Sequence, residues 1–92
     1  MVLTIDVLNE YRNMDALERH SERGKAIRAE MEERMRWMPI RWRRLIRYRY
    51  ILRYSALRTA TELNVHRNTV TNWTHEIERW LEDKETYLNE QT

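Results

Sequence analysis

Apolar side chains recur mostly every three or four residues along the first third of this chain. This spacing matches the period of an α-helix and predicts helix over residues 4–37, with Thr4 as the N-cap. Gly24 leaves two interpretations open, because glycine weakens a helix interior but suits a helix end. The segment is either one continuous helix or two helices, of which the second begins at Lys25. The positions that define the spacing are Val7, Tyr11, Met14, Leu17, Gly24, Ile27, Met31, Met35 and Met38.

A second helical region begins at Pro39. Proline disfavours helix at the residue before it and suits the first turn of a helix, so we predict a helix from Pro39 to about Arg53. Apolar and basic residues recur there at spacings that place them on opposite faces. The predicted inner face holds Trp42, Leu45, Ile46, Leu52 and either Arg49 or Tyr50. The predicted outer face holds Arg41, Arg43, Arg44, Arg47 and Arg53.

The stretch from Ser55 to His75 has the pattern of two helices joined by a tight turn. Ser55 is the predicted N-cap of the first helix. Ala60 is small enough to let the two helices touch, and Asn64 tolerates the positive φ that the turn requires. We therefore predict a helix-turn-helix, whose second helix can enter a DNA groove. An ordinary helical hairpin is the alternative. The apolar stripe of the second helix consists of Val70, Trp73 and Ile77.

The helical spacing continues beyond His75. We predict a second helix over residues 67–88, about 33 Å long at ~1.5 Å per residue. Only its first two turns could enter a groove, so the remainder must pack on something else, either the N-terminal helices or a second copy of the chain. We expect its apolar stripe and the stripe of the N-terminal segment to pack together across a homodimer. The side chains concerned are Trp80, Leu81 and Leu88 in the first stripe, and Met14, Leu17, Ile27 and Met31 in the second.

Charge is distributed unevenly along the chain. The net charge is only +2, but residues 34–75 contain ten arginines against the single acid Glu62, a balance of +9. Residues 1–33 have a balance of −3 and residues 76–92 a balance of −4. A basic block between acidic ends suggests a polyanionic partner for the middle of the chain. The alternative is a basic face that pairs with the acidic ends of the same fold.

Composition narrows the class of protein. One Gly and one Pro in 92 residues, with few β-branched residues, argue against a sheet and predict an all-α protein. The chain has no cysteine, and its three histidines do not have metal-ligand spacing, so we expect no metal site. It also has no glycine-rich phosphate loop, and we expect neither a cofactor nor enzymatic activity. We find no membrane-spanning run and no signal peptide, which predicts a cytoplasmic protein without membrane contact.

The middle of the chain resembles region 4 of the sigma factors. That family has a Leu-Pro, a Val-Leu-x-Leu-Arg-Tyr stretch, a short link with Gly, and then a helix-turn-helix. This chain has Met38-Pro39, then Leu-Ile-Arg-Tyr-Arg-Tyr-Ile over residues 45–51, and then the Ser55–His75 stretch. The resemblance covers about residues 38–82. It departs from the family at Arg53, where Gly is common, and at His66, where a Ser or Thr cap is usual.

The whole layout is similar to small phage late-gene activators of the RinA and ArpU type, which precede a sigma-like helix-turn-helix with a helical segment. This implies a segment for packing or oligomerisation at 1–37 and a DNA-binding domain at 38–92. It also implies a sequence-specific transcriptional regulator, dimeric and encoded by a phage, in a bacterial or phage-infected cell. Its partners would be double-stranded DNA and, as a further candidate, RNA polymerase.

Two groups of residues are predicted to contact DNA. Arginine suits the guanine edge and asparagine the adenine edge, so the exposed residues of the second helix are expected to meet bases. The residues before and within the first helix are expected to meet phosphate. The base group is Arg67, Asn68, Thr71 and Asn72, and the phosphate group is Arg53, Ser55 and Arg58. Two alternatives stay open: a small-terminase-like subunit for DNA packaging, and a helix-turn-helix scaffold that binds RNA polymerase or another protein.

Overall fold

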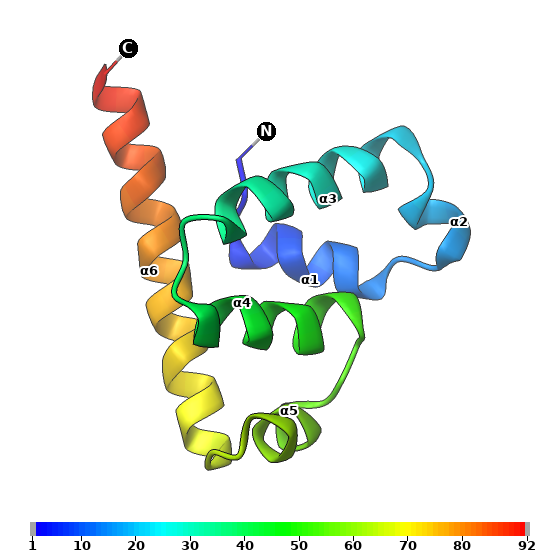
Figure 1. Ribbon diagram of the computed structural model, residues 1–92. Coiled ribbons are helices and arrows are strands. Elements are labelled where there is room, and N and C mark those ends of the chain that lie inside the picture. The colour runs from blue at the N-terminus through cyan, green and yellow to red at the C-terminus, as the bar shows by residue number, and fades with distance from the viewer. Residues whose placement is uncertain (1, 92) are drawn as a thin grey trace.

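The computed structural model describes the backbone of residues 2–91 and the side chains of residues 2–83. These residues form helices and contain no strand, so the protein is all-α. No helix in the described part of the chain is both long enough and apolar enough to cross a membrane. In Figure 1, α1 lies between α3 and α4, α6 runs along one side of all three, and α5 lies at the bottom of the view beside the start of α6. The elements are α1 (Ile5–Asn13), α2 (Ala16–Arg19), α3 (Glu22–Met35), α4 (Ile40–Ile46), the π-helix η1 (Arg47–Ile51), α5 (Ala56–Leu63) and α6 (Arg67–Gln91).

The N-terminal segment forms three helices, which corrects the expectation of one or two. Each helix begins at a side-chain cap, and the predicted cap is confirmed because the Thr4 hydroxyl accepts from the Val7 N–H at 3.2 Å. The two further caps interrupt the helix that the apolar spacing predicted. The Asp15 carboxylate caps α2, and the Ser21 hydroxyl caps α3 by accepting from the Gly24 N–H at 3.1 Å.

Gly24 therefore lies in the first turn of α3 and does not end a helix. A Cβ atom at this position would meet the backbone carbonyl oxygens of Glu18 and Arg19, the second at 2.6 Å. Since both are backbone atoms, no side-chain rotation could relieve the contact. Glycine is required here because α2 and α3 approach each other more closely than a side chain would allow.

The basic helix after Pro39 is shorter than predicted. The α-helical part ends at Ile46, and η1 follows with the wider hydrogen bonding of a π-helix, in which the Leu52 N–H donates to the Arg47 carbonyl at 2.9 Å. Tyr50 takes the inner position, at 2 % exposed. Leu52 was predicted on the inner face and is 49 % exposed, because the wider turn changes the direction in which later side chains point.

Helices α5 and α6 are joined by a tight turn over residues 64–66. The predicted positive φ of Asn64 is confirmed, at 57°. The Val65 N–H donates to the Ala60 carbonyl at 2.9 Å and the Asn64 N–H to the Thr61 carbonyl at 3.1 Å. These two bonds form a Schellman ending of α5, which satisfies carbonyl groups that the helix leaves free. Ala60 is 3 % exposed, as its predicted place between the helices requires.

One hydrophobic core contains side chains from both predicted segments, 1–37 and 38–92. This corrects the predicted dimer contact: Met14, Ile27 and Met31 are at most 5 % exposed within their own chain, and Leu81 is 2 % exposed. Leu17 is the exception among the described residues of the stripes, since it is 84 % exposed. Trp80 is half-buried, with its ring edge-on to Trp42 at 6.4 Å. Leu88 lies outside the described side chains.

Candidate nucleic-acid interface

The first two turns of α6 present a polar face to solvent. The side chains of Arg67, Asn68, Thr71 and Asn72 are exposed, while Val70 is 1 % exposed on the opposite side. We call these four exposed residues the α6 face. They occupy positions i, i+1, i+4 and i+5, which share one side of a helix. Their amide, hydroxyl and guanidinium side chains are exposed, as the helical spacing predicted for the first turns of this helix.

The N-terminus of α6 is capped by an unusual residue. The His66 Nδ1 accepts from the Asn68 N–H at 3.1 Å, and the His66 carbonyl accepts from the Thr69 N–H at 2.9 Å. His66 thus performs the capping role that serine or threonine has in most helices. The cap fixes the direction in which Arg67 and Asn68 leave the turn.

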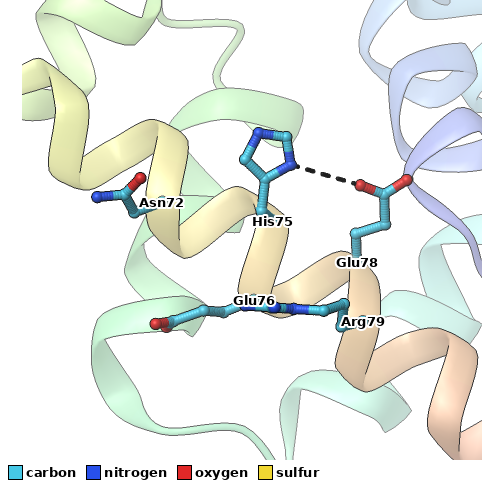
Figure 2. Close-up of a pocket in the computed structure, with 5 residues that line it drawn as sticks. All are labelled: Asn72, His75, Glu76, Glu78 and Arg79. Atoms are coloured by element: carbon cyan, nitrogen blue, oxygen red, sulfur yellow. Dashed lines mark ion pairs between the residues drawn. The ribbon is translucent and has the colours of Figure 1, made fainter.

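The α6 face ends where acidic side chains begin. Residues 67–75 contain no acid, whereas Glu76 and Glu78 follow directly. Figure 2 shows these two carboxylates with Asn72, His75 and Arg79 around an open concavity of about 590 Å³ on α6, and His75 lies 3.7 Å from Glu78. Carboxylates repel phosphate, so the part of α6 without acidic side chains ends at His75.

A second exposed group surrounds the link between η1 and α5, which comprises residues 52–55. Ser55 caps α5 as predicted, because its hydroxyl accepts from the Arg58 N–H at 3.0 Å. The Arg58 guanidinium lies over the Tyr54 ring at 3.7 Å, and the Tyr54 ring stacks on Tyr48 at 5.5 Å. This stack holds the cationic group beside the N-terminus of α5. We call Arg53, Ser55 and Arg58 the link face.

Arg53 has a backbone conformation that suits glycine. Its φ is 63°, in the left-handed region that L-residues with a Cβ seldom adopt. The bend turns the chain from η1 into α5, and the Arg53 side chain stays exposed. Arginine is therefore present at a strained position that ordinary backbone preferences would give to glycine.

Three further arginines donate hydrogen bonds to backbone carbonyls in η1 and in the link. Arg12 Nε donates to the Arg49 carbonyl at 3.0 Å, and Arg19 donates through its two terminal nitrogens to the carbonyls of Tyr50 at 3.1 Å and Ile51 at 2.8 Å. Arg49 Nη1 donates to the Tyr54 carbonyl at 2.8 Å. We call Arg12, Arg19 and Arg49 the arginine clamp. Arg12 and Arg19 satisfy carbonyls at the C-terminal end of η1, where positive charge is also favoured by the helix dipole, and Arg49 satisfies a carbonyl of the link.

Burial affects the charge of the clamp. It is the main cause that lowers the pKa of Arg19, and the neighbouring Arg53 and Arg28 lower it further. Burial also lowers the pKa of Arg49, with a contribution from Arg12. Within the described residues, none of the three clamp arginines forms an ion pair with a carboxylate. The positive charge behind the link is therefore not neutralised locally and adds to the field of the link face.

The sequence predicted the four residues of the α6 face as exposed and Arg53 on an outer face, and the structure exposes these five together with Ser55 and Arg58. It groups Ser55 with Arg58 and Arg53 around the link, and the remaining four on α6. Sequence reasoning missed the clamp, because Arg12 and Arg19 lie more than thirty residues from the carbonyls they bind. It also missed the tyrosine stack beneath Arg58. Their short-range signal was weak: basic residues and tyrosines are common on solvated faces.

Comparison of the chain with protein-family models, with curated proteins and with solved structures found no match.

Proposed function

We propose that this protein is a sequence-specific double-stranded DNA-binding regulator of transcription, built around a helix-turn-helix of the sigma region 4 type at α5 and α6. The observation that carries the proposal is the combination of the two faces. The exposed start of α6 carries side chains suited to base edges, and the link before α5 carries arginines that have no carboxylate partner among the described residues. Proteins that read DNA combine these two elements, because phosphate contacts position the protein and base contacts specify the sequence.

Two local features support the likeness to sigma region 4. Arg53 has the positive φ at the position where that family often has glycine. His66 caps α6 at the position where that family usually has serine or threonine. Both departures in residue type therefore preserve the backbone role that the likeness requires. The proposal also includes the resemblance of this chain to small phage late-gene activators of the RinA and ArpU type.

The two faces have different expected roles. The α6 face would enter the major groove, where Arg67 suits guanine and Asn68 suits adenine. The link face would bind the phosphate backbone through Arg58, Arg53 and the N-terminus of α5. The Arg58 guanidinium is held on Tyr54, so less side-chain entropy would be lost when a phosphate binds.

Single-arginine variants test this division. The duplex is first selected from random sequences with the intact chain, and binding to this duplex and to a scrambled duplex is then titrated against salt. Arg58→Ala should weaken both complexes alike and reduce the salt slope by about one unit. Arg67→Ala should cost about 1–3 kcal/mol on the selected duplex and much less on the scrambled one.

Arg23→Ala provides the matched control, because Arg23 is exposed on α3 and its ion pair is with Glu10. It removes one positive charge outside both faces. Should Arg67→Ala weaken both duplexes equally, Arg67 is a phosphate contact and the assignment of the α6 face is wrong. If the intact chain binds no duplex at low salt, the DNA-binding proposal itself fails.

A protein partner is a second element of the proposal. Trp37 is 69 % exposed and Ile40 is 67 % exposed on either side of Pro39. Exposed tryptophan is enriched at protein interfaces, and a site read by one helix-turn-helix per chain usually recruits a dimer. We propose that this apolar patch contacts a second copy of the chain, with RNA polymerase as the other candidate. Sedimentation of the intact chain and of Trp37→Asp tests the homodimer, which a monomer at tens of micromolar would contradict.

A further inference from the structure

A cationic pocket lies beside Arg19, one of the three clamp arginines. Tyr11, Arg19, His20, Lys25, Arg28 and Ala29 line an open concavity of about 540 Å³. α1, α2 and α3 all contribute to it, and we call it the α1–α3 pocket. Its volume lies within the range of small-molecule sites, roughly 300–1,000 Å³. Neither the α6 face nor the link face supplies a residue to it.

The chemistry of the pocket favours an anion. Arg19, Lys25 and Arg28 bring three cations to its wall, and its lining includes no carboxylate. Arg28 Nε donates to Glu32 Oε1 at 3.0 Å, and side-chain hydrogen bonding with Tyr11, followed by that with Glu32, raises the pKa of Arg28. Guanidinium groups bind phosphate through paired N–H donors, and an ammonium group adds a point charge.

The floor of the pocket is apolar. Tyr11 is 3 % exposed and its ring lies 4.3 Å from the Arg19 guanidinium, while Ala29 adds a small methyl surface. The Arg19 guanidinium already covers the Tyr11 ring, so a ligand would meet mainly Ala29 and the aliphatic stems of Lys25 and Arg28. The pocket therefore suits an anionic group attached to an organic body, and a phosphate monoester has both.

Arg19 connects the pocket to the DNA-binding part of the protein. The same guanidinium that lines the pocket donates to the carbonyls of Tyr50 and Ile51 at the end of η1. An anion in the pocket would compete with these carbonyls for Arg19 and would neutralise charge behind the link. The first effect would disfavour the observed arrangement of the link, and the second would weaken the attraction of the link face for phosphate.

We propose that the α1–α3 pocket binds a small phosphate monoester and that this ligand lowers the affinity of the protein for DNA through Arg19. The first half concerns the chain alone, whereas the second rests on the proposed function. The shared chemistry is phosphate, which could also come from the DNA backbone itself. The experiment separates these two sources.

Calorimetric titration of the intact chain without DNA tests the first half. The probe is adenosine 5′-monophosphate, with inorganic phosphate and uncharged adenosine as comparisons. Lys25→Ala removes an exposed pocket cation and should weaken binding of the monophosphate by roughly tenfold, the effect expected for one charged hydrogen bond. Arg23→Ala is the matched control, because Arg23 lies on the same helix but is paired with Glu10 at 2.7 Å outside the pocket. Circular dichroism verifies that both variants fold.

The outcomes decide each half separately. No binding of the monophosphate, equal binding of adenosine, or equal loss in Lys25→Ala and Arg23→Ala would overturn the pocket.

DNA affinity is then measured at saturating monophosphate, where coupling predicts a weakening of about fivefold or more that reaches a plateau. An unchanged affinity would overturn the coupling through Arg19. If the monophosphate displaces DNA without a plateau and Lys25→Ala alone weakens DNA binding, the pocket holds a backbone phosphate and the small ligand is wrong. A chain that binds monophosphate but no DNA would contradict the proposed function and leave the pocket established.

Discussion

Replacement of Gly24 by alanine tests how closely α2 and α3 pack. The new Cβ would lie 2.6 Å from the Arg19 carbonyl oxygen and closer still to that of Glu18, whereas real Cβ contacts stay above about 3.0 Å. The nearby atoms belong to the backbone, so α2 itself must move. In an unconstrained helix the same substitution would stabilise the protein by up to about 1 kcal/mol. The structure therefore predicts the opposite sign to helix propensity.

The magnitude follows from these two opposing effects. Overpacking of a well-filled contact costs typically 1–3 kcal/mol, and a contact with backbone belongs at the upper end. After the propensity gain is subtracted, we expect Gly24→Ala to lower the free energy of unfolding by about 1–2 kcal/mol. For a chain of 92 residues this corresponds to a melting temperature lower by roughly 5–15 °C.

Thermal and urea unfolding, both followed by circular dichroism, measure the change. Ala26→Gly serves as the control, because Ala26 is exposed on the same helix and its replacement costs only helix propensity, about 1 kcal/mol. Because α2 carries Arg19, the Gly24→Ala variant should also bind DNA more weakly under conditions where it remains folded. A variant that melts at a higher temperature than the intact chain would refute the close contact between α2 and α3.

Substitutions at three further positions test α5 and the link before it. Thr59 is fully buried, and its hydroxyl has no hydrogen-bond partner among the described residues. Thr59→Val should therefore raise the free energy of unfolding, measured in urea, by about 1 kcal/mol. A lower free energy of unfolding would mean that the hydroxyl does have a partner. Ala60→Leu should lower stability by roughly 1–3 kcal/mol because the α5–α6 contact has no room, and an unchanged melting temperature would show that the helices do not meet there. Arg53→Gly and Arg53→Ala both remove the charge, but only glycine relieves the strain of the positive φ. Arg53→Gly should therefore be more stable than Arg53→Ala by about 1 kcal/mol. Both variants should weaken binding to the selected and the scrambled duplex alike. If only one of the two variants binds DNA more weakly, the shape of the backbone and not the charge is responsible.

The sequence determined the features that depend on neighbours a few residues apart. Ser55 caps α5 because a hydroxyl at that position reaches the N–H three residues later. Asn64 ends α5 because few other side chains tolerate positive φ. The residues of the α6 face were predictable as exposed from helical spacing alone, since that spacing also identified Val70 and Ile77 as buried. Local rules of this kind need no knowledge of the rest of the fold.

Helical spacing identified apolar faces but could not identify what covers them. Met14, Ile27 and Met31 were predicted to meet a second chain, and the structure buries them in the core of their own chain. The same apolar stripe could pack either on a second chain or on the rest of its own chain. The choice depends on how the caps at Asp15 and Ser21 redirect the chain, so that three short helices fold back where one long helix would have projected.

Only the tertiary structure decided the arrangement around the link. The turn of η1 widens to a π-helix, which exposes Leu52 and frees carbonyls that Arg12 and Arg19 then bind across more than thirty residues of chain. Gly24 has its role only because α2 lies against α3. Such contacts depend on the relative positions of whole helices. Helix positions are set by the sum of many weak packing interactions over the core, which no short pattern in the sequence records.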